Sequence, residues 1–348
     1  MRYLVIAVVL VGCFRSPAPV SSTEDMCGPG ASIVAAPLGT MRGGQIPPAN
    51  TYSIVARDPV TGDLGVAVQS HYLAVGAVAP WAESGVGAVA TQSAVETSYG
   101  PKGLALMKGG VSAPDAMAQL IAADKGSATR QLGFVDAQGQ AASHTGAQCI
   151  EFMGSHVGAG YAVQANIMAN DRVVPAMAAA YEASRGDLAE RLLTALDAAQ
   201  AAGGDMRGCQ SAAILVVSGT RSETPWKERK VDLRVDDHPD PLRELRRMSR
   251  IVRANDQLSQ GEAAFGKGDR DGALAHYRAA PLMAPGDVEI AFWTAVAIAT
   301  QGSVDEAIPL MRSTYARNPN WIEVTRRLVA PGILPQAVVD RMLPAGTR

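Results

Sequence analysis

The distribution of apolar and polar positions from Thr51 onward predicts a series of β-strands. Thr51–Arg57 combines β-branched and aromatic side chains, and Leu64–Ser70 is a second strand-like run. Residues 58–63, with the sequence DPVTGD, carry turn-forming residues between the two runs. The chain therefore predicts a β-hairpin that opens at Thr51, well inside the sequence.

Beyond this hairpin, groups of strands are separated by pairs of helices. Further strands are predicted at residues 85–92, 131–136, 141–145 and 161–168, and from Ser211. Helical spacing of apolar residues predicts helices at residues 98–110, 112–126, 171–184 and 188–202. This order does not fit the strict alternation of a doubly wound fold. We expect an α+β fold over residues 51–240, a four-layer α/β/β/α sandwich with helices outside two stacked antiparallel sheets.

The strand signals stop near residue 240, and the remaining chain, residues 241–348, reads as a small all-α domain. A period of 34 residues brings four positions back in phase: Gly268, Ala273, Tyr277 and Pro285 recur as Gly302, Ala307, Met311 and Pro319. This pattern is similar to two tetratricopeptide repeats, supported by the helix from Pro241 and a capping helix from Trp321. We expect these repeats to dock a protein partner or to form a homo-oligomer contact.

The first fifty residues have the composition of an export signal and a tether. Residues 1–13 join a positive start and a short apolar run to LVGC, which resembles the bacterial lipobox with Cys13 as the lipidated residue. An ordinary secretory signal is the alternative. Residues 14–50 are rich in Pro, Gly, Ser and Ala, as flexible tethers are. We expect export to the periplasm or cell envelope, with a lipid anchor in the membrane at Cys13.

Bulk composition narrows the classes of partner. Apolar residues make up 47% of the chain and charged residues 18%, which indicates a globular protein, and a net charge of −2 argues against a nucleic-acid partner. No cysteine pair has metal-site spacing and the histidines form no HExxH, so no metal and no other cofactor is expected. At most one disulfide can form among Cys27, Cys149 and Cys209. Buried free thiols are the favoured interpretation for Cys149 and Cys209.

Several long stretches resemble the bacterial family called domain of unknown function 1028. They include TYSIVARDPVTGDLGVAV, YGPKGLALMKGG, GYAVQANIM, AAGGDMRGCQSAAILVV and VDLRVDDHPDPLREL. The resemblance implies a fold like that of the N-terminal-nucleophile (Ntn) hydrolases, whereas the family's activity is not established. Family members commonly read Met-Thr where this chain has Asn50 and Thr51. Exposure of Thr51 as a terminal residue therefore needs a cut between these two residues, by self-processing or by a protease.

A terminal threonine can carry its own base, because its α-amino group has a pKa near ambient pH. Thr51 is therefore a candidate nucleophile, and the alternative is an ordinary strand residue. A cut before Thr51 would also separate the domain from a lipid on Cys13. Ser53 lies on the same strand face and could line the same pocket or bond within the sandwich. Asn166 is a candidate oxyanion donor, or else a satisfied buried amide.

Two further pairs are candidate ligand-binding residues. Asp205 and Arg207 lie in the glycine-rich turn GGDMRG, which could aim them at a ligand or pair them with backbone, and Thr91 and Gln92 end a buried strand. The sequence thus predicts an exported, lipid-anchored amidohydrolase acting on a small amide or peptide-like ligand. The alternative is a non-catalytic, ligand-binding envelope lipoprotein whose helical repeats dock a protein partner.

Overall fold

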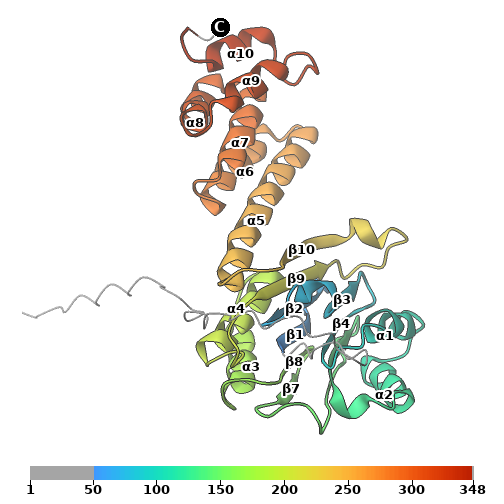
Figure 1. The fold of residues 1–348 in the computed structure, drawn as a ribbon. Helices are drawn as coiled ribbons and strands as arrows, with labels where there is room; N and C mark the ends of the chain where they lie inside the picture. The colour runs from blue at the N-terminus through green and yellow to red at the C-terminus, as the bar shows by residue number, and fades with distance from the viewer. Residues whose placement is uncertain (1–50, 347–348) are drawn as a thin grey trace, which may run out of the picture.

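A computed structural model describes residues 51–346 of the chain. The predicted signal peptide, the tether, Cys13 and Cys27 lie outside the described residues. The expected α+β class is confirmed: two antiparallel sheets are followed by a helical C-terminal part (Figure 1).

The larger sheet has six strands in the order β10-β9-β2-β1-β8-β7. Their bounds are β1 Thr51–Arg57, β2 Leu64–Ser70, β7 Gly154–Gly158, β8 Tyr161–Ala165, β9 Ser211–Val217 and β10 Arg229–Val235. The predicted hairpin is β1 and β2, in which Thr51 pairs with Ser70. Ser70 pairs in turn with Ser211 on β9, so the three residues lie in a row across the sheet, at one end of these three strands.

The smaller sheet has four strands in the order β3-β4-β5-β6. Their bounds are β3 Pro80–Glu83, β4 Gly87–Ser93, β5 Arg130–Asp136 and β6 Ala141–Thr145. The two sheets face each other, and apolar side chains from β1, β2, β8 and β9 pack there against others from β4 and β5. These side chains include Val55, Val66, Ala88, Val135 and Leu215.

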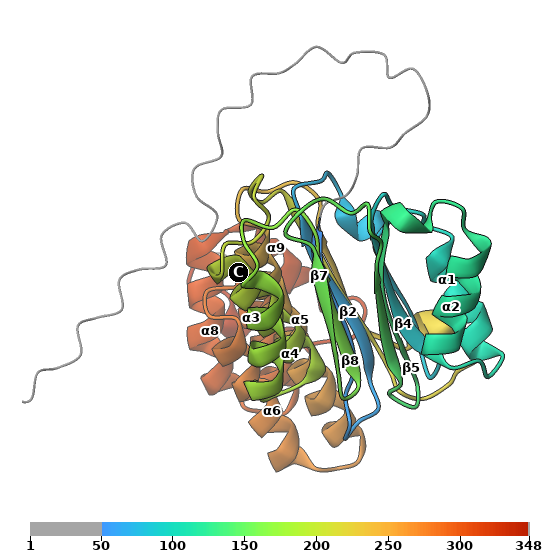
Figure 2. The same ribbon diagram turned by 90° about the horizontal axis from the view of Figure 1, so that it is seen from below.

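Helices cover both outer faces of this pair of sheets (Figure 2). On the smaller sheet lie α1 (Tyr99–Lys108) and α2 (Ala113–Ala123), and on the larger sheet lie α3 (Val173–Ala183) and α4 (Leu188–Ala201). The hydroxyl of Ser112 accepts a hydrogen bond from the Asp115 amide and so caps the N-terminus of α2. Short 3-10 helices occupy Val75–Ala77, Ser127–Thr129 and Pro225–Lys227.

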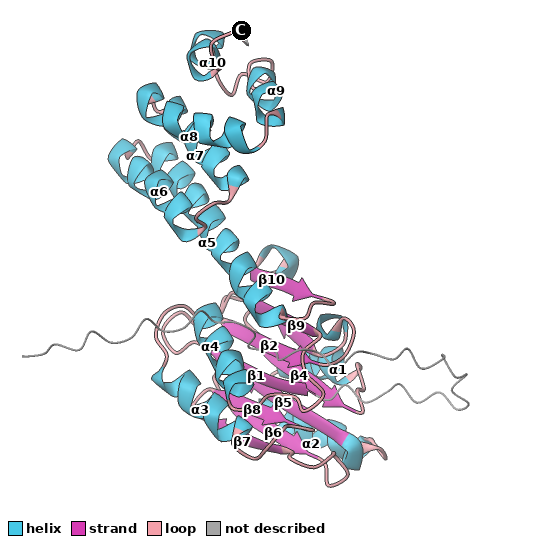
Figure 3. Cartoon of the chain, turned by 60° about the vertical axis from the view of Figure 1, so that its left-hand side comes forward, coloured by secondary structure: helices cyan, strands magenta, loops and turns pink. Residues whose placement is uncertain are grey.

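The C-terminal part consists of packed helices that extend away from the sheets (Figure 3). They are α5 (Pro241–Gly266), α6 (Arg270–Met283), α7 (Val288–Thr300), α8 (Val304–Arg317), α9 (Asn320–Arg327) and α10 (Gln336–Met342). The 34-residue period places Ala273 in α6 and Ala307 in α8, and both side chains are fully buried. Gly268 and Gly302 both have positive φ in the turns before these helices. Within residues 51–346 no helix is both long and apolar enough to cross a membrane.

Helix α5 belongs to both parts of the protein. Near its start, Leu242 and Leu245 pack in the core between the larger sheet and its helices, whereas Ala254 packs against α6 and α7. Ion pairs fasten it to α4: Arg246 contacts Glu190 at 2.7 Å and also Asp197. Arg253 contacts Glu190 at 2.9 Å, so that the same carboxylate binds both guanidinium groups.

Candidate functional site

Polar side chains gather between the two sheets at the end where β1 begins. Thr51 and Ser53 of β1 and Ser70 of β2 lie on the larger sheet's inner face and are fully buried. Gln92 of β4 and Gln131 of β5 face them from the smaller sheet and are fully buried as well. The other end of the same interface is apolar. This polar end is the candidate functional site.

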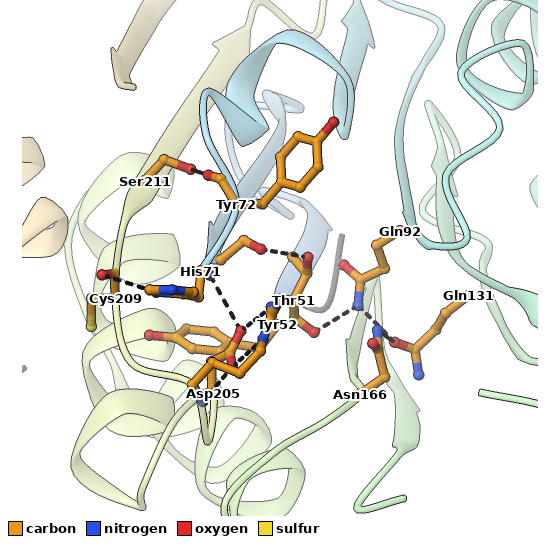
Figure 4. Close-up of polar contacts among 12 residues, drawn as sticks. Thr51, Tyr52, His71, Tyr72, Gln92, Gln131, Asn166, Asp205, Cys209 and Ser211 are labelled. Atoms are coloured by element: carbon orange, nitrogen blue, oxygen red, sulfur yellow. Dashed lines mark hydrogen bonds and ion pairs between the residues drawn. The ribbon is translucent and has the colours of Figure 1, made fainter. Parts of the chain in front are cut away.

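Thr51 is held at this site by both its side chain and its backbone (Figure 4). Its hydroxyl donates a hydrogen bond to the Ser70 hydroxyl at 3.1 Å. Its carbonyl oxygen accepts bonds from the Asn166 backbone N–H and from the Gln92 side-chain amide, both at 3.1 Å. Hydroxyl and amide groups from four segments of the chain thus meet at the first residue of β1.

Ser53 joins the two sheets through side-chain bonds. Its hydroxyl donates to Gln92 Oε1 at 2.6 Å and accepts from Gln164 Nε2 at 2.5 Å. Gln164 is the β8 residue that pairs with Ser53 in the sheet register. Ser53 therefore lies beside Thr51, as the sequence suggests, and is tied into a network of buried amides.

Gln131 is the centre of this amide network. Its Oε1 accepts from Gln92 Nε2 and from Asn166 Nδ2, each at 2.7 Å. Its Nε2 donates to the Thr145 hydroxyl at 3.0 Å and to the Ala165 carbonyl at 2.8 Å. Among the described residues, the buried oxygen atoms Asn166 Oδ1 and Gln164 Oε1 have no hydrogen-bond partner. The site therefore retains unused acceptors in a place sealed from water.

Backbone strain occurs beside two of these amides. Ile167, which follows Asn166, has φ of 55°, and Ser93, which follows Gln92, has φ of 69°. A β-branched residue such as isoleucine rarely adopts this left-handed region, and such strain costs on the order of 1–3 kcal/mol. Asn166 lies just beyond β8, which ends at Ala165, rather than inside the strand predicted over residues 161–168. Strain of this kind is concentrated at functional sites in proteins.

Asp205 and Arg207 lie beside the site, at the same end of the strands of the larger sheet. The Asp205 carboxylate accepts bonds from Arg207 Nη2 at 2.7 Å and Arg207 Nε at 3.1 Å. It also accepts a bond from the backbone N–H of His71, the residue after β2, at 3.2 Å. The carboxylate is completely buried. Its hydrogen bonds hold the 205–207 turn against the end of β2.

Thr91 is separated from the site, although Gln92 is part of it. Successive strand residues point to opposite faces, and the Thr91 hydroxyl donates to the carbonyl of Glu96 at 3.2 Å, near the start of α1. The structure thus brings together Thr51, Ser53, Gln92 and Asn166, places Asp205 and Arg207 at the edge, and leaves Thr91 outside.

The expectation of two free thiols is wrong for Cys209. Cys149 is free and buried, and burial raises the pKa of its thiol. Cys209, by contrast, is disulfide-bonded. It is only partly buried and follows the glycine-rich turn, where its carbonyl oxygen lies 3.4 Å from His71 Nδ1. The sequence pattern could not show that Cys209 lies in the partly exposed loop before β9 rather than in a buried position.

The chemistry available at the site is that of hydroxyl and carboxamide groups. Within residues 51–346 no group of three or more His, Cys, Asp or Glu side chains is arranged to hold a metal ion. Sequence reasoning missed Ser70, Gln131 and Gln164. The signal for them was present, because each is a polar residue within or at the end of a predicted strand that is otherwise largely apolar.

Comparison with known proteins places this fold among relatives. The family model described as a family of unknown function, DUF1028, matches residues 51–245. The crystal structure of protein SPO2555 from Silicibacter pomeroyi, also described as DUF1028, is 34% identical with a TM-score of 0.53. That match covers 58% of this chain and 85% of the other. No curated protein matches the chain. The match to the family model spans more than half of the sequence and includes the whole candidate site, so the chain belongs to the DUF1028 family.

Proposed function

We propose that this protein is an amidohydrolase with an Ntn-hydrolase-like fold, activated by a cut between Asn50 and Thr51. The observation that carries the proposal is the position of Thr51, the first residue of β1 at the polar end between two sheets. Its hydroxyl already donates to a second hydroxyl, Ser70. The strained residues Ile167 and Ser93, which follow two amides of the site, give independent support.

The cut would give Thr51 the base that it lacks in the uncut chain. Hydrolysis of the bond before Thr51 consumes one water and leaves a carboxylate on Asn50 and an α-amino group on Thr51. That amine has an ordinary pKa of about 7.7–8.0, so roughly a tenth of it is unprotonated, and able to act as a base, at pH 7. The amine is then fixed close to the Thr51 hydroxyl, which a weak nucleophile requires.

The reaction on an amide or peptide-like substrate follows from these groups. Thr51 Oγ1 attacks the carbonyl carbon while the α-amine takes its proton, and this proton passes to the departing amine as the C–N bond breaks. The acyl group is then held as an ester on Thr51. Water, deprotonated by the same amine, hydrolyses the ester and restores the hydroxyl.

The oxyanion formed during the attack needs hydrogen-bond donors in a water-free place. The side-chain amide of Gln92 and the backbone N–H of Asn166 both reach the Thr51 carbonyl, and the Asn166 side-chain amide lies beside them on Gln131. We assign the oxyanion donors to these amides, with Asn166 as the principal one. Donors fixed by a rigid network lose little free energy to reorganisation during the reaction.

The cellular setting belongs to the same proposal. The protein would be an exported lipoprotein of the periplasm or cell envelope, anchored at Cys13, with tetratricopeptide-like helices that dock a protein partner. The disulfide at Cys209 supports export, because such bonds persist in oxidising compartments.

A non-catalytic, ligand-binding lipoprotein is the second candidate. It is favoured by the complete burial of Thr51 in the uncut chain and by the close bonding of Ser53, Gln92 and Gln131. A network of this kind can specify the packing of two sheets without chemistry. In that case the bond between Asn50 and Thr51 stays whole.

The deciding experiment is N-terminal sequencing and intact mass of the protein recovered from a bacterial envelope fraction. A chain that starts at Thr51 supports the amidohydrolase proposal, and an uncut bond between Asn50 and Thr51 refutes it. A panel of fluorogenic peptide amides then tests Thr51→Ala, with Thr314→Ala as the matched control. Thr314 is also buried and hydrogen-bonded but lies in α8, so its loss should leave hydrolysis unchanged.

A further inference from the structure

The disulfide at Cys209 points to a covalent link between the domain and the segment that precedes Thr51. The chain contains four cysteines, and Cys149 is free and buried. Within one chain this leaves Cys13 and Cys27 as partners for Cys209, and both lie outside the described residues. A lipidated Cys13 carries its sulfur as a thioether, which cannot form a disulfide. Cys27 is then the remaining partner.

Cys209 is well placed for such a link. It lies two residues before Ser211, whose register neighbour Ser70 pairs with Thr51. Neighbouring strands lie about 4.8 Å apart, and two such spacings, from β1 to β2 and from β2 to β9, separate Thr51 from Ser211 by about 10 Å. Residues 28–50 span many times that distance when extended, at about 3.3 Å per residue. A bond from Cys27 to Cys209 therefore fits the length of chain that ends at Thr51.

We propose that Cys209 is bonded to Cys27, and that this disulfide keeps the N-terminal segment attached after the chain is cut before Thr51. Both halves of the proposal rest on the proposed function: the pairing takes Cys13 as lipidated, and the retention needs the cut before Thr51. When the bond forms, two thiols lose two protons and two electrons to a protein disulfide of the export compartment, which becomes a dithiol. The cut then removes the peptide link but leaves the sulfur link.

This arrangement resolves a conflict in the amidohydrolase proposal. A cut before Thr51 would otherwise free the domain from a lipid on Cys13. With the disulfide in place, the anchor stays joined to the domain through Cys209 while Thr51 gains its free amine. Reduction of one bond would then release the domain from the membrane, so attachment becomes redox-dependent.

Peptide mapping without reduction tests the pairing on the full chain isolated from the envelope. After alkylation of free thiols, we expect a Cys27 peptide joined to a Cys209 peptide, with alkylated Cys149. Three results would overturn the pairing: Cys209 alkylated without reduction, Cys209 joined to Cys13, or Cys209 joined to a second copy of the chain.

Intact mass tests the retention. We expect the unreduced protein to weigh as the whole mature chain plus one water, and to split into two chains on reduction. A chain that starts at Thr51 and lacks the segment before reduction overturns retention and leaves the amidohydrolase proposal standing. An uncut chain in which Cys27 is joined to Cys209 overturns retention and the proposed cut, while the pairing stands.

Two matched variants add a cellular readout. Cys27→Ser should move the cut domain from the membrane fraction to the soluble fraction, a near-complete loss of attachment. Cys149→Ser, which removes the buried free thiol, should leave attachment unchanged. Wild-type protein should leave the membrane only when a reductant is added. If Cys27→Ser fails to fold, the peptide map of the wild-type chain decides the pairing.

Discussion

The hydroxyl of Thr51 donates a hydrogen bond to the hydroxyl of Ser70, its direct partner across the pair of strands β1 and β2. This contact between two neutral hydroxyls occurs in a fully buried position at the very start of β1. It orients the Thr51 oxygen by the sheet register rather than by a mobile loop. Under the proposed function, this contact would hold the Thr51 oxygen in one direction for its attack on the substrate.

The contact predicts an effect of Ser70→Ala on the cut protein. Loss of the acceptor should reduce amide hydrolysis by about tenfold or more, because Thr51 Oγ1 is no longer held in one direction. The free energy of unfolding should fall by about 1 kcal/mol. Initial rates and urea titrations measure the two effects.

Ser211→Ala is the control for this variant. Ser211 bonds to the carbonyl of Tyr72 and the amide of Val75 and not to Thr51, so it should cost stability and leave the rate unchanged. Equal rate losses in the two variants would refute the special role of Ser70.

The amide network predicts a large loss of stability for Gln131→Leu. The substitution keeps the volume but leaves the amides of Gln92 and Asn166 without their shared acceptor. We expect a loss of about 3 kcal/mol in the free energy of unfolding, since buried polar groups without partners are costly. Gln140→Leu, at an exposed position, should change stability by less than about 0.5 kcal/mol. Similar urea midpoints for the two variants would contradict the structural importance of the network.

The crossing of α5 and α6 predicts opposite effects for two glycines of one helix. A Cβ at Gly261 would collide with the ring of Tyr277, so Gly261→Ala should destabilise the helical part by about 1–3 kcal/mol. Gly266→Ala meets open space near the end of α5 and should be neutral, or stabilising by up to about 1 kcal/mol. Thermal unfolding of both variants, followed by circular dichroism, checks this. A stable Gly261→Ala protein would mean that the helices cross less closely.

A pH-dependent contribution to stability is predicted at Asp124. A side-chain bond from Arg130 Nε at 2.9 Å, helped by the Gly126 amide and the Tyr99 hydroxyl, holds the pKa of this carboxyl below its usual range. A lowered pKa in the folded state means that the contribution is complete above the ordinary pKa of about 3.9. It is lost as pH falls through the lowered folded value.

Asp124→Asn should therefore lower the free energy of unfolding by about 1 kcal/mol at pH 7. The difference between wild type and variant should shrink below about pH 4 as the wild-type carboxyl becomes protonated. Urea titrations at several pH values measure the difference. A gap that stays constant down to about pH 2 would rule out a contribution from the charged form.

Most of the strands that the sequence predicted are buried on both faces, and the exception is β6, a half-buried strand at the edge of the smaller sheet. Ser211–Val217 is buried along its whole length and Thr51–Arg57 is buried up to Ala56, and a strand between two layers favours the mostly apolar or small side chains found there. The strands that were missed lie at sheet edges: β7 and β10 are partly exposed, and β10 alternates charged with apolar residues. The four residues of β3 begin with a proline, which a central strand would not tolerate.

The candidate site was predictable in part, for reasons of strand geometry. The two-residue period correctly places Thr51 and Ser53 on one face, and it would also have separated Thr91 from Gln92. Register was the missing information. Nothing in the local pattern aligns Gln131 with Gln92, or Gln164 with Ser53, because such pairing depends on the order of strands in the sheets.

Helix α5 sets a fixed geometry between the site and whatever the C-terminal helices bind. Its 26 residues span about 39 Å without interruption, with one end in the core of the sheets and the other against α6. Each residue turns an α-helix by about 100°. The direction in which the C-terminal helices hold a bound partner, relative to the sheets, therefore depends on the number of residues in α5. Loss or gain of one residue midway would swing α6 and the later helices to another side of the protein while leaving every contact at Thr51 intact.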